Sequence, residues 1–174
     1  LLLNLMKTKI LYITYDGLME PLGQSQVWQY LRSLSKLHLI VILSFEKHAD
    51  LANAKLKQHI ESELKDAGIQ WFPLKYHKRP SALATLYDLI RGICLTIYAV
   101  MKYKVKIIHA RSYVASLIAL VLKKTLKVKF IFDMRGFWAD ERVDGGLWPK
   151  GGRMFRVAKW FEKNQPQVVI NAAA

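Results

Sequence analysis

The sequence has little cysteine, glycine, proline and acidic side chain, and each shortage excludes a class of protein. A single cysteine, Cys94, leaves no partner for an intrachain disulfide and favours a reducing compartment. Nine glycines and five prolines among 174 residues are too few for a collagen-like chain. Because 52% of the residues are hydrophobic and 23% are charged, the sequence predicts one globular core and not a disordered tail.

The shortage of acidic residues gives the chain a strong positive charge. There are 27 Lys and Arg against 13 Asp and Glu, a net charge of +14 at pH 7. The basic residues gather in four groups: Lys75, Lys78 and Arg79; Lys102, Lys104 and Lys106; Lys123, Lys124, Lys127 and Lys129; and Arg153, Arg156, Lys159 and Lys163. An anionic lipid surface or a nucleic acid is the implied partner. We favour the membrane surface, because no RNA- or DNA-binding module is recognisable.

The longest apolar stretch, residues 83–101, is long enough to cross a membrane. Asp88 and Arg91 interrupt its middle, where a charge is costly in hydrocarbon, so we predict no membrane span. Cys94 lies in the same stretch. We expect it to be a small buried hydrophobic residue and not a nucleophile.

The two ends of the chain differ from the segment between them. Met6 leads directly into a strand-like run, so we interpret residues 1–5 as a non-native extension. Alanines close the chain, and we interpret residues 172–174 as a vector-derived tail. Residues 6–171 are then the expected domain.

Strand-like and helix-like segments alternate along this domain. Apolar runs of strand length predict strands at residues 10–15, 39–45, 69–76, 105–109, 128–134 and 167–170. Helical spacing predicts helices at residues 24–34, 49–67, 80–103, 112–124 and 153–163. Gly68 is expected as a helix C-cap and Ser112 as an N-cap. The alternation predicts an α/β fold, a three-layer α/β/α sandwich with a mainly parallel sheet of about six strands.

In a parallel sheet, the loops that leave the carboxyl ends of the strands build the binding crevice. Three such loops are expected, at residues 16–25, 109–112 and 133–146. In the first, Gly17 and Gly23 precede a helix that begins near Gln24, so the backbone could approach an anionic group. The two glycines could equally be turn residues that only shape the loop.

The second loop begins with His109, two residues before Arg111. A neutral imidazole there could bind a ligand hydroxyl or act as a general base near pH 7, and the arginine could pair with phosphate. The alternative is a structural histidine bonded to a neighbouring loop.

The third loop contains four carboxylates, two arginines and three glycines. The interleaved arginines favour ion pairs over a metal site, and no metal-ligand pattern is recognisable. An internally salt-bridged loop and a ligand-recognition loop remain open alternatives.

Three blocks of sequence resemble bacterial retaining glycosyltransferases of family 4. They are residues 15–27, YDGLMEPLGQSQV, residues 108–112, IHARS, and residues 132–138, FDMRGFW. The resemblance covers residues 6–163. It implies one half of a GT-B enzyme, in which a Rossmann-like amino-terminal lobe holds the acceptor and a second lobe holds a nucleotide-sugar donor, without a required metal.

The resemblance also implies roles for individual residues. His109 would face the transferred sugar as the catalytic residue. Gly23 and Gln24 would approach the donor phosphates from across the cleft. The acceptor or sugar side would be formed by Asp16, Gly17, Arg111, Asp133, Arg135 and Trp138.

The chain departs from the family because the nucleotide-sugar lobe, with its Glu-x7-Glu block, is absent from these residues. We therefore expect no sugar transfer by this chain alone, no cofactor bound by this lobe, and a donor lobe as its partner, in cis or separately encoded. The expected acceptor is a sugar or a lipid-linked, cell-envelope molecule. The expected location is the cytoplasm, at the inner face of the cytoplasmic membrane.

Two alternatives from other classes remain at this point. The chain could be a free-standing membrane-docking or partner-binding module of a split glycosyltransferase. A smaller alternative is a nucleic-acid-binding domain that relies on its general basicity.

Overall fold

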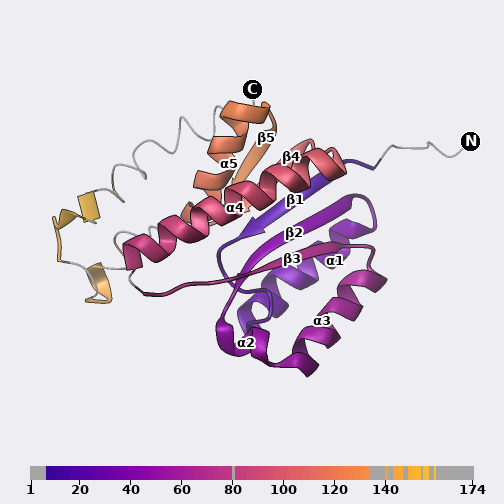
Figure 1. The fold of residues 1–174 in the computed structure, drawn as a ribbon, viewed down its shortest axis with the longest axis horizontal. Coiled ribbons are helices and arrows are strands. Elements are labelled where there is room, and N and C mark those ends of the chain that lie inside the picture. The colour runs from indigo at the N-terminus through magenta and orange to yellow at the C-terminus, as the bar shows by residue number, and fades with distance from the viewer. Residues whose placement is uncertain are drawn as a thin grey trace, which may run out of the picture.

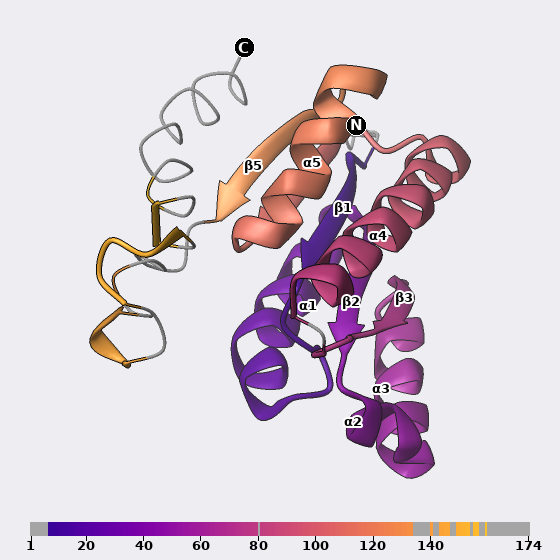
Figure 2. The ribbon, with the colours of Figure 1, turned by 60° about the vertical axis from the view of Figure 1, so that its left-hand side comes forward.

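A computed structural model describes residues 7–79, 81–133, 140, 143–146, 149–153, 155–156 and 159. In this part of the chain, one sheet contains the strands β1 (Lys9–Thr14), β2 (Leu39–Glu46), β3 (Gln70–Lys75), β4 (Ile107–Arg111) and β5 (Lys129–Asp133). All neighbours are parallel, in the order β3-β2-β1-β4-β5. The arrows of β2 and β5 both point downwards in Figure 2. The π-helical turn η1 (Gly23–Trp28) and five α-helices connect the strands: α1 (Gln29–Ser35), α2 (His48–Ala52), α3 (Ala54–Asp66), α4 (Ser81–Tyr103) and α5 (Tyr113–Leu126).

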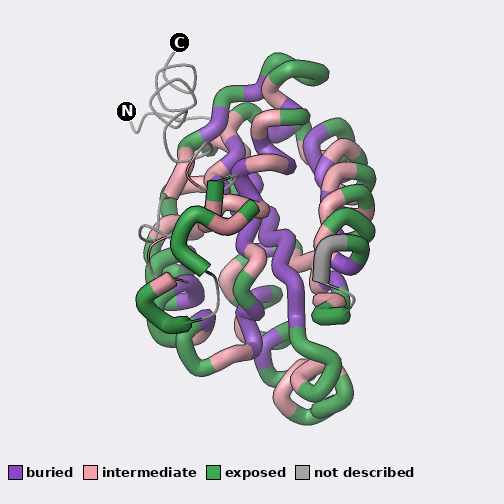
Figure 3. Tube along the Cα trace, turned by 90° about the vertical axis from the view of Figure 1, so that its left-hand side faces the viewer, coloured by how far each residue is buried: buried purple, intermediate pink, exposed green. Residues whose placement is uncertain are grey.

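The helices cover both faces of the sheet, with α4 and α5 on one side and α1 and α3 on the other (Figure 1). Alternating side chains of β1 supply both interfaces: Leu11 and Ile13 join the core under α4 and α5, and Tyr12 joins the core under α1 and α3. Buried residues concentrate in the strands at the centre of the molecule (Figure 3). The predicted three-layer, Rossmann-like α/β sandwich is therefore confirmed, with five strands in the described residues. The strand predicted at residues 167–170 lies outside them, as does most of the helix predicted at 153–163.

The helix predicted at residues 49–67 is wrong in one respect, because the chain forms two helices there. Asn53 separates α2 from α3, and its side-chain oxygen accepts the Leu56 N–H at 3.1 Å, which caps α3. The predicted C-cap at Gly68 is present. Gly68 has a φ of +70°, and its N–H and that of Ile69 donate to the carbonyls of Lys65 and Leu64, which is a Schellman motif.

Ser112 is the N-cap residue of α5, as predicted, but its side chain makes no capping hydrogen bond. Its backbone has a φ of 79°, and its N–H donates to the Asp133 carbonyl at 3.1 Å. This bond ties the end of β4 to the end of β5. Strand β4 also lies two residues further along than predicted, so His109 and Arg111 belong to the strand and not to the loop after it.

Residues Leu83–Tyr103 of α4 are long and apolar enough to cross a membrane by length and composition, and about a third of this stretch is buried in the protein. The helix nevertheless packs on α5, β1 and β2, and its Asp88 is fully buried. Cys94 is exposed on this helix, so the expectation of a buried cysteine is wrong. The apolar residues of α4 occupy more of its circumference than the domain covers.

Candidate functional site

The carboxyl ends of the strands form a row of polar side chains across the sheet. In the register of the ladders, Thr14 of β1 lies opposite both Ser44 of β2 and Arg111 of β4, and Arg111 lies opposite Asp133 of β5. The chain leaves β1 towards β2 on one side, whereas α4 crosses to bring β4 to its other side. This reversal is a topological switch point, where parallel α/β folds bind their ligands.

Three predicted site residues meet at this row. The His109 Nε2 and the Arg111 Nη1 lie 3.7 Å and 3.9 Å from the same oxygen, Oδ2 of Asp133. Arg111 is 7% exposed, and its Nη2 donates to Gln26 Oε1 at 2.9 Å. One carboxylate therefore balances a nearly buried guanidinium and approaches an imidazole.

The His109 ring is held between two tyrosines. Its centroid lies 4.8 Å from that of Tyr12 and 5.9 Å from that of Tyr30. Burial lowers the pKa of His109, although the Asp133 carboxylate opposes the shift, so the imidazole is neutral at neutral pH. Its Nε2 is buried with no hydrogen-bond partner among the described residues. This nitrogen faces the Asp133 carboxylate at 3.7 Å, which is beyond hydrogen-bond distance.

Burial also raises the pKa of Tyr12 to about 12, against the opposing effect of Arg111. The Tyr12 phenol therefore stays protonated. The Nε of Arg111 is buried and, in the described part of the chain, has no hydrogen-bond partner. Among the described residues, four buried side-chain atoms have no hydrogen-bond partner: two belong to this site, on His109 and Arg111, and two lie elsewhere, on His38 and Asp50.

The loop after β1 is fixed by a buried carboxylate that the sequence analysis did not identify. Glu46, at the end of β2, is fully buried, and its two oxygens accept the N–H groups of Leu18 and Met19 at 2.8 and 3.0 Å. Ser44 Oγ donates to the same carboxylate at 2.5 Å. Burial raises the pKa of Glu46, and these hydrogen bonds oppose the rise.

Both glycines of the loop are explained by close packing. A Cβ at Gly17 would lie 2.8 Å from Glu46 Oε2, and a Cβ at Gly23 would lie 2.1 Å from the Gly17 carbonyl oxygen. Gln24 uses its side-chain amide to donate to the Met19 carbonyl at 2.9 Å. The loop is therefore compact without a ligand, and the approach of Gly23 and Gln24 to donor phosphates stays a prediction.

Asp16 lies at the start of this loop, where its N–H donates to Thr14 Oγ1 at 3.2 Å. Partial desolvation raises the pKa of its carboxyl, while the charge of Arg111 opposes the rise and Glu20 adds to it. Glu20 in turn pairs with Lys47 at 2.7 Å. Arg135 and Trp138, the remaining predicted acceptor residues, lie outside the described residues.

Several residues around the site were missed by sequence reasoning. Glu46 ends an apolar strand, where a lone buried carboxylate could have been noticed, but its partners lie 28 and 27 residues away. Gln26 is 85 residues from Arg111, and nothing in the sequence connects them. Among the described residues, no group of three or more His, Cys, Asp or Glu side chains could hold a metal ion.

No protein-family model and no curated protein matches the chain. Several chains of solved structures align with it, among them the following two. A glycosyltransferase from Rickettsia africae aligns over 73% of this chain with a TM-score of 0.48 and 19% identity. The C-terminal domain of a hydrogenase from Pyrococcus furiosus aligns over 72% of this chain and 90% of its own length, with a TM-score of 0.48 and 16% identity. This chain spans 29% of the glycosyltransferase. At such scores and identities, the similarities assign no activity.

Proposed function

We propose that the chain is the acceptor-binding lobe of a retaining, family 4 glycosyltransferase of GT-B architecture. The observation that supports this most directly is that described residues from each of the three family-like sequence blocks lie at one edge of the sheet. The glycine loop follows β1, His109 and Arg111 end β4, and Asp133 ends β5. The donor lobe, with a nucleotide sugar, would close over this edge from outside the chain.

The side chains at this edge suit an uncharged, hydroxyl-rich ligand. With the Asp133 side chain moved aside, the neutral imidazole of His109 would accept a hydrogen bond from a sugar hydroxyl at its buried Nε2, or donate one in the other tautomer. The Asp133 carboxylate, whose side chain is 32% exposed, can accept hydroxyl donors. In the complete enzyme, such fixed groups would stabilise an oxocarbenium-like transition state at the transferred sugar.

The test is a ligand titration of the chain, followed in two-dimensional NMR spectra of the backbone amides and of the His109 imidazole. The probes are methyl glycosides of glucose, galactose, mannose and N-acetylglucosamine, together with UDP-glucose. We expect at least one methyl glycoside to shift the His109 and Asp133 signals at millimolar concentration. The variant His109→Phe keeps the ring packing and should lose this response, whereas His59→Phe on the exposed face of α3 should retain it.

Two results would overturn the assignment. One is the absence of any glycoside response at His109. The other is binding of UDP-glucose in the low micromolar range, because a lobe that already holds the donor is not the acceptor lobe.

A second candidate, a module that docks on an anionic membrane at the inner face of the cytoplasmic membrane, is favoured by the outer face of α4. Large apolar side chains are exposed there at helical spacing: Leu83, Leu86, Tyr87, Ile90, Tyr98 and Met101. Basic residues flank the helix, with Lys78 and Arg79 before it and Lys102 and Lys104 at its end. An apolar stripe with cationic ends matches the interface of an anionic bilayer.

Vesicle flotation tests this second candidate. The double variant Ile90→Ser/Met101→Ser removes side chains that are 52% and 67% exposed on α4. Its control, Leu37→Ser/Ile131→Ser, removes two that are 67% and 52% exposed elsewhere. We expect only the α4 variant to lose binding to vesicles that contain phosphatidylglycerol. Equal loss in both variants, or no binding by the parent chain, would exclude docking through α4.

A further inference from the structure

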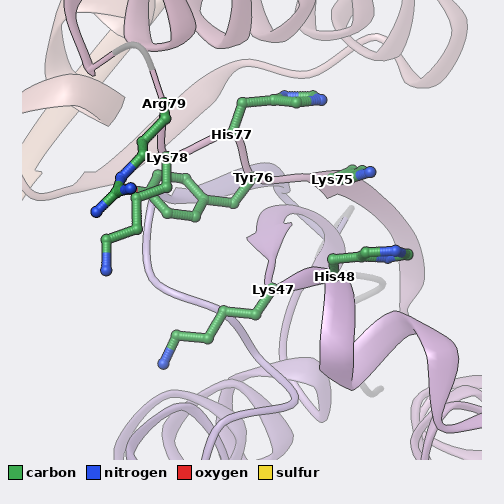
Figure 4. A pocket seen from close by; sticks show the side chains of 7 residues that line it. All are labelled: Lys47, His48, Lys75, Tyr76, His77, Lys78 and Arg79. Carbon is green, nitrogen blue, oxygen red and sulfur yellow. The ribbon is translucent and has the colours of Figure 1, made fainter.

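A second polar feature lies at the same edge of the sheet, beyond β2 and β3. It is an open pocket of about 570 Å³, lined by Lys47, His48, Lys75, Tyr76, His77, Lys78 and Arg79. We call it the basic pocket. Four of its seven lining residues are Lys or Arg, two are His, and none is Asp or Glu. Figure 4 shows the side chains of this pocket around the ends of the two strands.

Most of this charge is not neutralised by the protein. Lys47 pairs with Glu20 at 2.7 Å, and the His77 Nδ1 lies 2.6 Å from Asp88 Oδ1. Within the described part of the chain, no carboxylate lies in ion-pair range of the other three cations, Lys75, Lys78 and Arg79. Uncompensated positive charge around a pocket raises the local concentration of anions.

Hydrogen bonds to β2 and α4 hold the backbone of Tyr76 and His77, which is part of the pocket lining. The Tyr76 N–H donates to the Glu46 carbonyl at 2.8 Å, and the His77 N–H donates to Asp88 Oδ2 at 2.9 Å. Asp88 is fully buried and also accepts the Tyr15 hydroxyl at 3.2 Å. These bonds fix the backbone at Tyr76 and His77, the two lining residues that directly precede Lys78 and Arg79.

The side chains divide into two groups in Figure 4. The ends of Lys47, Lys78 and Arg79 point to one side together with the Tyr76 ring, and those of His48, Lys75 and His77 point to the other. The Tyr76 ring packs on Tyr15, with centroids 5.4 Å apart, so the first group lies on the side of the loop after β1. Helix α4 starts at Ser81, directly after this segment, and its amino-terminal end adds positive potential.

We propose that the basic pocket binds the phosphate or diphosphate group of a phosphate ester. Arg79 offers the planar fork of donors that suits phosphate oxygens, and Lys78, which also has no carboxylate partner among the described residues, supplies a point charge on the same side of the pocket in Figure 4. The ester reaches the pocket either as a soluble compound or as a lipid whose apolar part lies along α4. This inference needs no glycosyl transfer and stands if the acceptor-lobe proposal fails.

Isothermal titration calorimetry with inorganic pyrophosphate at low ionic strength tests the site. The double variant Lys78→Gln/Arg79→Gln removes two exposed charges from the pocket. Its control, Lys123→Gln/Lys124→Gln, removes the same charge from the last turn of α5. We expect the dissociation constant to rise about tenfold or more in the pocket variant and by less than about twofold in the control. Circular dichroism should show both variants folded, because the four side chains are on the surface.

A second arm separates the two sources of phosphate. Flotation with phosphatidylcholine vesicles that contain phosphatidic acid presents the same group on a lipid. Loss of vesicle binding in the pocket variant alone identifies a lipid phosphate, whereas a response to pyrophosphate without a vesicle effect identifies a soluble ester. The proposal is overturned if pyrophosphate does not bind, or if the pocket and control variants weaken it equally, which would indicate diffuse basicity.

Discussion

The Glu46 carboxylate holds the Leu18 backbone at the start of the candidate site, because its Oε1 accepts the Leu18 N–H at 2.8 Å. Its second oxygen accepts the Met19 N–H at 3.0 Å. The carboxylate thus accepts hydrogen bonds from two buried backbone N–H groups that cannot reach water, in the loop that joins β1 to η1. The position of this loop beside His109 and Arg111 depends on an anchor in a different strand.

Replacing this anchor, Glu46→Gln, should loosen the loop. One carboxylate oxygen becomes an amide NH2, which cannot accept the N–H that faces it, and a buried unsatisfied donor costs about 1–3 kcal/mol. Urea unfolding at pH 7 should show this loss, and hydrogen exchange should accelerate at Leu18 and Met19. Glu61→Gln, which removes an exposed pair with Lys57, should cost less than about 0.5 kcal/mol. Similar costs for both variants would contradict the anchoring role.

The substitution Gly23→Ala tests the packing of the same loop. The new Cβ would lie 2.1 Å from the Gly17 carbonyl oxygen and 2.8 Å from the Leu18 Cα, and backbone atoms cannot move aside as a flexible side chain does. Overpacking of this kind costs about 1–3 kcal/mol. Thermal unfolding should detect the loss, whereas Ser25→Ala at an exposed neighbouring position should have little effect. An unchanged melting temperature for Gly23→Ala would mean that the loop is not close-packed.

The lowered pKa of His109 predicts a pH dependence of stability. The group has its ordinary pKa of 6.5 when unfolded, so below that pH the unfolded chain binds a proton that the folded chain resists. Stability should therefore fall as the pH drops below 6.5, until the folded-state pKa is passed. The Asp133 carboxylate, which favours the charged ring, and Arg111, which disfavours it, both face His109, while Tyr12 and Tyr30 cover the ring.

The measurement compares the unfolding free energies of the parent chain and of His109→Phe between pH 7.5 and pH 5. The unfolding free energy of the parent chain should decrease relative to that of His109→Phe as the pH falls, because the variant lacks the titrating group. His109→Gln should give the same trend from a different side chain. A trend in the opposite direction would mean that Asp133 outweighs burial.

The pair formed by Arg111 and Asp133 should be energetically coupled. The guanidinium is nearly buried and lies 3.9 Å from the carboxylate, so removal of Asp133 leaves a buried charge without its partner. In a double-mutant cycle of Arg111→Gln and Asp133→Asn, the coupling should fall within about 0.5–3 kcal/mol. The exposed pair of Lys57 and Glu61 is the control, with an expected coupling of about 0.3–0.5 kcal/mol. No excess over this control would show that the site pair is solvated.

The parts of the fold that could be predicted are those that depend on neighbours in the sequence. The apolar run of β2 predicts a strand covered on both faces, because every residue from Ile40 to Phe45 must leave water. Gly68 predicts the end of α3, because a left-handed residue is needed there. Both signals lie within a few residues of the structure they specify.

The parts that could not be predicted depend on contacts between distant residues. Asp88 interrupts an apolar helix, and in the structure it contacts Tyr15, 73 residues away, and His77 in the lining of the basic pocket. The sequence alone gives no sign of either contact. The same limit applies to the exposed face of α4. Apolar residues surround much of that helix, and only the packing of α5 and the sheet decides which of them are covered.

Cys94 provides a direct probe of that face, because it is exposed and is the single cysteine of the chain. It lies four residues from both Ile90 and Tyr98, and therefore on the same stripe of α4. An NBD fluorophore on Cys94 should shift its emission to the blue and brighten when vesicles with phosphatidylglycerol are added, because the bilayer interface is less polar than water. High salt should reverse the change, since the basic residues are screened. The control is Cys94→Ser with Gln58→Cys on the exposed face of α3, which should keep its emission unchanged. A blue shift at both positions would place the whole domain near lipid without a preferred face, and no shift at Cys94 would exclude insertion of α4.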